Sequence, residues 1–109
     1  MTPLLRYSIQ YSPETKALAR LFKPFHLVSI REAINEQLRL EPTVKTKNRF
    51  PLDESKHRFE DSEWELRCGN NNQFRVFYKV DETAHVVFVV GIGIKVREKT
   101  FIGGKEFIE

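Results

Sequence analysis

The sequence lacks the features that stabilise secreted domains and the features that place a chain in a membrane. Cys68 is its single cysteine, so no disulfide can form within the chain, and with only three scattered histidines a zinc site is not expected. No apolar run approaches the roughly 20 residues that cross a bilayer. The N-terminal residues are too few and too polar for a signal peptide. We therefore expect a cytoplasmic protein with no metal, no cofactor and no membrane association.

A strong charge of either sign is also missing. The chain has 18 Lys and Arg against 15 Asp and Glu, a formal charge of +3, and the excess is spread along its length. Such a balance is compatible with a nucleic-acid partner but does not require one. A basic site would have to arise from the arrangement of cations in space. The composition, 40% hydrophobic and 30% charged, is ordinary for a globular protein, and 109 residues predict a single domain over 1–109.

The first part of the chain predicts one strand and two helices. Residues 4–11 alternate between apolar and polar, with Leu5 on the apolar side, which is typical of a half-buried strand. Ser12 supplies a helix N-cap followed by a proline. A second helix begins near Pro24, has apolar residues at spacings of three and four, and ends by Glu41. The two helices are expected to form a hairpin.

Residues 42–62 show no clear periodicity, although they carry many cations. A stretch of this length without regular structure is more often functional or mobile than idle. Its basic side chains are therefore candidates for contacting nucleic acid, together with one lysine near the C-terminus; the set is Lys45, Lys47, Arg49, Lys56, Arg58 and Lys99. The alternative is a solvated loop that happens to be rich in lysine.

Residues 64–104 are the most informative part of the sequence. They predict three consecutive strands joined by two tight turns, the first turn rich in Gly and Asn. The order strand, two helices and three-stranded antiparallel meander predicts an α+β domain whose helices pack on one sheet face.

Isolated cations lie among the apolar residues of this meander. Without a bulge, Gly91, Gly93, Lys95 and Arg97 share one face of the last strand. The glycines would let a ligand approach the backbone, and the cations would hold its charge. Arg75, in the neighbouring strand, is expected to point to the same side.

A structural reading of the same residues remains open. Arg75 would then pair with Glu65 or Glu98, and the glycines would mark a bulge. Cys68, in the middle of a strand, is interpreted as a small core residue.

Three motifs carry a resemblance to a known family. In chain order they read EWELRC, FRVFYKV and VVFVVGIGIK. With the order of the elements, they resemble the RelE/ParE superfamily, the toxins of bacterial type II toxin–antitoxin systems. The resemblance implies a single RelE/ParE-like toxin domain, a cognate antitoxin as partner, and inhibition of translation. RelE-like members are metal-independent endoribonucleases that cleave messenger RNA on the ribosome, where the ribose 2′-hydroxyl attacks the adjacent phosphate.

The resemblance also implies a catalytic role for four residues. Arg75 matches the family's arginine that holds the reacting phosphate. Arg67 matches a basic position in the preceding strand. Lys95 matches a catalytic arginine, with Arg97 two residues further on.

Two positions depart from the RelE-like pattern. Glu65 stands where those enzymes have a second basic residue, and Phe101 stands where they have a tyrosine. Two alternatives therefore stay open: a ParE-like inhibitor of DNA gyrase that cleaves nothing, and a non-toxic member of the fold.

Overall fold

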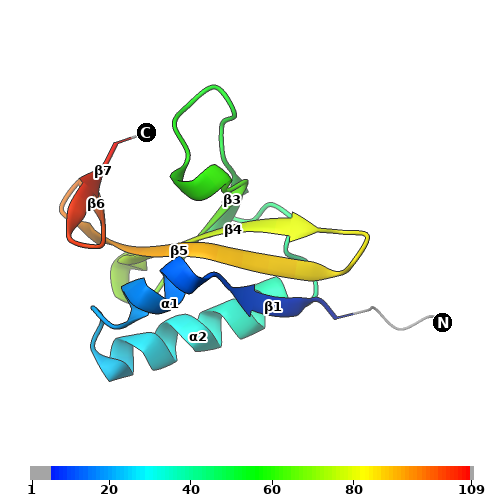
Figure 1. The fold of residues 1–109 in the computed structure, drawn as a ribbon, viewed down its shortest axis with the longest axis horizontal. Helices are drawn as coiled ribbons and strands as arrows, with labels where there is room; N and C mark the ends of the chain where they lie inside the picture. Colours follow the sequence, from blue (N-terminus) through cyan, green and yellow to red (C-terminus); the bar gives the residue numbers. More distant parts are fainter. Residues whose placement is uncertain (1–5, 109) are drawn as a thin grey trace.

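The computed structural model describes residues 6–108 of the protein. Its main feature is a mostly antiparallel sheet of seven strands. Two α-helices, α1 (Pro13–Ala19) and α2 (Pro24–Leu38), lie together on one side of this sheet (Figure 1). The strands in chain order are β1 (Ser8–Tyr11), β2 (Arg49–Pro51), β3 (Trp64–Cys68), β4 (Phe74–Asp81), β5 (Val86–Val96), β6 (Lys99–Ile102) and β7 (Lys105–Phe107). None of the described helices is long and apolar enough to cross a membrane.

The predicted architecture, a helical hairpin followed by a three-stranded meander, is wrong. The fold is dominated by its sheet, in which β2, β6 and β7 join the three strands of the meander and β1. The three additional strands have only three or four residues each, too few to display a period of two in the sequence. Of the strand predicted at 4–11, Leu5 lies outside the described residues, and β1 begins at Ser8.

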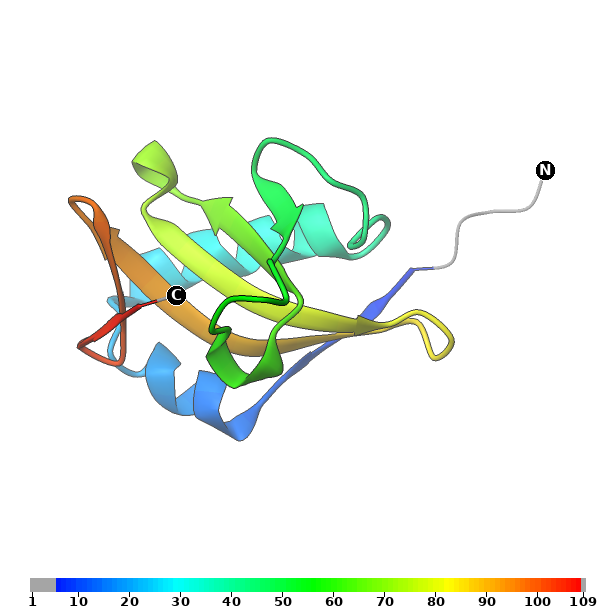
Figure 2. The ribbon, with the colours of Figure 1, turned by 90° about the horizontal axis from the view of Figure 1, so that it is seen from above.

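Strand β5 holds the sheet together because it pairs with three other strands along its two edges. Strand β4 runs antiparallel along one edge, with a register shift between Phe77 and Tyr78. On the other edge, β1 pairs in parallel with the first part of β5, and β6 pairs antiparallel with its last residues. The β6–β7 hairpin extends from the far end of β5 (Figure 2). Pairing on both edges and cover on both faces explain why 86–90 is apolar at every position.

The main core lies between α2 and the sheet. Ile30, Ile34 and Leu38, spaced four residues apart, form one face of α2 and are almost fully buried. They pack against buried residues of three strands, β3, β4 and β5: Leu66, Cys68, Phe74, Val76, Tyr78, Val87, Val89 and Ile92. A smaller apolar cluster contains Phe77, Val90 and Ile102, with Phe59 and Phe107 against it.

The two glycines of β5 accommodate parts of the protein. A Cβ at Gly91 would lie 2.2 Å from the Phe59 ring, and a Cβ at Gly93 would lie 2.8 Å from the carbonyl oxygen of Phe101. The expectation that these glycines open the sheet to a ligand is therefore wrong, because an aromatic ring and the β6 backbone already occupy the space.

Tyr78 offers a test of how the irregular segment after α2 is attached to the core. Its buried hydroxyl donates a 2.6 Å hydrogen bond to the carbonyl oxygen of Pro42. Tyr78→Phe leaves that acceptor without its donor, so we expect the free energy of unfolding to fall by about 1–3 kcal/mol in urea denaturation. Tyr7→Phe, at a half-buried tyrosine, is the control and should cost less than about 0.5 kcal/mol. Equal losses in the two variants would contradict this attachment.

Candidate anion-binding site

A charged hollow lies on the sheet face that points away from the helices. Glu65 and Arg75 alternate along their strands with Leu66 and Val76, which belong to the helix-side core, so their own side chains face the opposite way. The hollow has a volume of about 440 Å³. Its lining comes from β3, β4, β5, the turn between β5 and β6, and the β6–β7 hairpin with the residue after it: Glu65, Arg67, Arg75, Lys95, Glu98, Lys99, Thr100, Glu106, Phe107 and Ile108.

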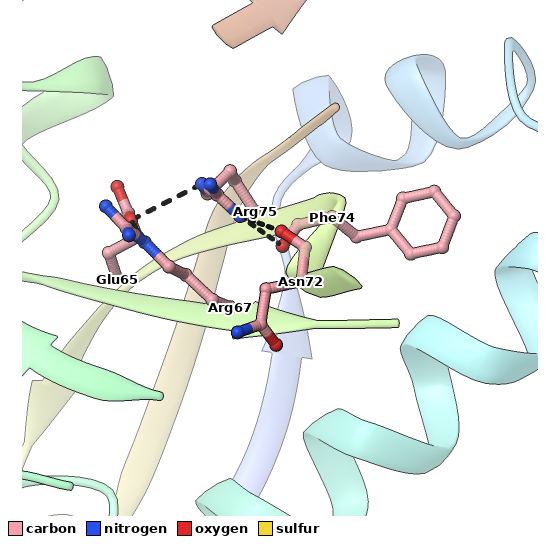
Figure 3. Close-up of polar contacts among 5 residues, drawn as sticks. All are labelled: Glu65, Arg67, Asn72, Phe74 and Arg75. Carbon is pink, nitrogen blue, oxygen red and sulfur yellow. Dashed lines mark hydrogen bonds and ion pairs between the residues drawn. The ribbon is translucent and has the colours of Figure 1, made fainter. Parts of the chain in front are cut away.

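One carboxylate and two guanidinium groups of this lining, those of Glu65, Arg67 and Arg75, lie close together (Figure 3). The Nε of Arg67 donates to Oε2 of Glu65 over 2.8 Å, and the Nε of Arg75 lies 3.6 Å from the same oxygen. The sheet sets this arrangement, since Arg67 and Arg75 are directly paired across β3 and β4. Glu65 precedes Arg67 by two residues and so shares its face.

Arg75 is a buried member of this group. Its side chain is 4% exposed. Its guanidinium donates to the backbone carbonyls of Asn72 and Phe74, so the arginine ties the turn before β4 to the sheet. That turn needs support, because Asn71 and Asn72 both adopt positive φ angles.

Arg67 is the exposed member, with 42% of its side chain accessible to solvent. Its guanidinium lies 4.8 Å from the ring centroid of Phe50 on β2, a cation–π contact. Glu65 and Phe50 thus orient Arg67, while much of its side chain remains available to a ligand.

Two lysines complete the cationic side of the charged hollow. Lys95 is half-buried, and its backbone N–H donates to the carbonyl oxygen of Gln73. Lys99 is exposed, and its Nζ lies 3.9 Å from a carboxylate oxygen of Glu106. Arg97, expected on the same face as Lys95, is exposed in the turn after β5 with a φ of 59° and does not line the hollow. The left-handed backbone ends the alternation of the strand.

The cations that were predicted to contact nucleic acid are not gathered in one place in the structure. Arg49 is 5% exposed, and its guanidinium donates to the carbonyls of Val44 and Gln37, which ties this segment to the last turn of α2. Lys99 alone of the predicted set lines the charged hollow. The rest are exposed or half-buried outside it: Lys45, Lys47, Lys56 and Arg58.

Apart from Lys99, the residues that the last hairpin contributes to the site were not predicted from the sequence. Glu106 and Phe107 reach the charged hollow because β7 folds back beside β6. Gly103 and Gly104, both at positive φ, form the connecting turn, and this glycine pair was the available signal. Phe101 is half-buried and is not part of the lining.

Cys68 does not line the charged hollow. It lies on the helix side of β3, and burial raises the pKa of its thiol to about 11, although the charge of Arg75 acts in the opposite direction. Little thiolate is therefore present at neutral pH, in agreement with the interpretation of Cys68 as a core residue. Within residues 6–108, no cluster of three or more His, Cys, Asp or Glu side chains is arranged to hold a metal ion.

The charged hollow is suited to binding an anion. Its four cationic and three carboxylate side chains leave a formal charge of +1 in a concave site. Guanidinium and ammonium groups fixed by a sheet are good donors to phosphate oxygens. No family model, curated protein or solved structure matches the chain, so its function has to be inferred from the site.

The different burial of the two arginines predicts different effects on stability. Arg75→Met would remove a buried partner of Glu65 and the donor to two carbonyls, and we expect a loss of about 3–5 kcal/mol. Arg67→Met should cost less than about 1 kcal/mol, because the pair that it breaks is partly solvated. Chemical denaturation of both variants measures these losses. A larger loss for Arg67→Met would contradict the buried support that we ascribe to Arg75.

Proposed function

We propose that the protein is a toxin of the RelE/ParE type that binds messenger RNA on the ribosome and cleaves it, which places it in the cytoplasm. The observation that carries this proposal is the convergence of Arg67, Arg75, Lys95 and Lys99 on one hollow of the open sheet face. The first three of these cations belong to the motifs that resemble the toxin family. A cognate antitoxin would inhibit the toxin by laying a helix or an extended segment over the charged hollow.

The cations differ in burial, and this difference suggests which of them contact the RNA. Arg67, Lys95 and Lys99 are exposed or half-buried and would contact the RNA phosphates. Arg75 lies behind them and acts through Glu65, which it holds in place. Attack of a ribose 2′-oxygen on phosphorus builds negative charge on the phosphate oxygens, and cations fixed beforehand stabilise that charge.

Cleavage also requires two proton transfers. The 2′-hydroxyl loses its proton as the new O–P bond forms, and the departing 5′-oxygen gains one as its bond to phosphorus breaks. Phe101 has no group that exchanges a proton. In the described lining of the charged hollow, the carboxylate of Glu98 or Glu106 would accept the first proton as a general base, worth about 10²–10⁴ in rate, and the ammonium of Lys95 or Lys99 would give the second to the departing 5′-oxygen.

Inhibition of DNA gyrase is the second candidate function. One observation favours it: the guanidinium groups of Arg67 and Arg75 already share the carboxylate of Glu65, which reduces the positive field available to a phosphate. Intact messenger RNA together with double-strand DNA breaks after induction would select this alternative.

Mapping of RNA 5′ ends tests the leading proposal. On induction of the chain without an antitoxin, we expect new 5′ ends confined to translated messages. Arg67→Ala and Lys95→Ala should each lower the yield of these ends by about tenfold or more, since each removes a phosphate contact. Lys79→Ala, which removes an exposed lysine of β4 outside the charged hollow, is the matched control and should cleave normally.

Two results would contradict the assignment. Normal cleavage by folded Arg67→Ala and Lys95→Ala variants would place the active site elsewhere. Induction with neither RNA cuts nor a growth defect would show that the chain is not a nuclease toxin.

A further inference from the structure

In the charged hollow, the carboxylate of Glu65 contacts the two guanidinium groups that could otherwise bind a phosphate. Its Oε2 accepts from the Nε of Arg67 over 2.8 Å and lies 3.6 Å from the Nε of Arg75. A phosphate oxygen uses the same geometry and the same donors, because carboxylate and phosphate are both acceptors for the guanidinium edge. Glu65 therefore competes with any phosphate for Arg67.

The two arginines differ in how easily they can release this carboxylate. The side chains of Arg75 and Glu65 are 4% and 3% exposed, so solvent screens their attraction little and separating them would leave a buried charge. The side chain of Arg67 is 42% exposed, and ion pairs in such a setting contribute little to stability. Arg67 is thus the partner that can exchange Glu65 for a ligand.

We propose that Glu65 is a built-in counter-anion that lowers the phosphate affinity of the charged hollow until an RNA strand displaces it from Arg67. The inference rests on the proposed function, because it takes RNA phosphate as the ligand. Arg75 retains Glu65 throughout, so the carboxylate stays in the protein and limits how tightly the product is held.

The competition between Glu65 and phosphate for Arg67 favours the binding of a polyanion over that of a single phosphate. A lone phosphate has to compete with Glu65 for Arg67, whereas an RNA strand can also place a neighbouring phosphate near Lys95 or Lys99. Without the charge of Glu65, the formal charge of the hollow rises from +1 to +2.

Binding of an uncleavable RNA tests the proposal. Glu65→Gln keeps the size of the side chain and an oxygen that accepts from Arg67, but it removes the charge. Fluorescence anisotropy with a fully 2′-O-methylated RNA oligonucleotide should show about tenfold tighter binding by this variant, with a salt dependence steeper by about one phosphate contact. Glu98→Gln removes the same charge from an exposed residue of the hollow and should tighten binding less than about threefold.

Several other results of this binding experiment would overturn the proposal. Equal effects of Glu65→Gln and Glu98→Gln would overturn it, since net charge alone would then set affinity. Weaker binding, or no binding by either wild type or variant, would overturn it as well. If Glu65→Gln does not fold, Glu65→Asp, which draws the carboxylate back from Arg67, should tighten binding about threefold, and an unchanged affinity would overturn the proposal.

The uncleavable probe keeps this result separate from the proposed nuclease. Tighter binding by Glu65→Gln, together with intact messages in cells, would support the counter-anion and refute cleavage. Cuts in messenger RNA, together with an unchanged affinity of Glu65→Gln, would support the nuclease and refute the counter-anion.

Discussion

The ion pair between Arg75 and Glu65 is the interaction on which the site depends. Both side chains are buried on a sheet face, where an unpaired charge would cost several kcal/mol. Arg75 also donates to the carbonyls of Asn72 and Phe74, so the same guanidinium fixes the turn between β3 and β4. The carboxylate that it holds then orients Arg67 at the surface. In our proposal, Arg75 contributes stability and Arg67 contacts the ligand, and these two arginines are paired across β3 and β4.

Strand β5 supplies the frame for this pair. It binds β4 along one edge, and β1 and β6 share its other edge. Gly93 lies opposite Arg75 in the β4–β5 register, and Lys95 follows two residues later on the same face. The hairpin of β6 and β7 adds Lys99 and Glu106 to the lining of the charged hollow. The lining of the hollow thus combines residues that are up to 43 positions apart in the sequence, from Glu65 to Ile108.

The sequence predicted the parts of this structure that local patterns determine. The Ser12 N-cap and the apolar spacing of α2 located both helices, and alternation located β3 and β4. The short strands β2, β6 and β7 could not be predicted, because their pairing depends on partners already in place. Arg75 and Lys95 share one face, as predicted, and Arg75 also pairs with Glu65, as the structural reading of the sequence predicted; Arg97 leaves that face at a left-handed turn. The burial of Arg49 depends on carbonyls in α2 and the segment after it, and no local pattern indicates it.

Side-chain NMR of the arginine Nε–H groups tests the central claim most directly. During titration with an uncleavable RNA oligonucleotide, the Nε–H signal of Arg67 should shift in proportion to binding, because this group exchanges a carboxylate for a phosphate. The signal of Arg75 should stay in place, because its buried pair with Glu65 persists. A titration in which Arg75 shifts and Arg67 does not would contradict the division of roles between the two arginines.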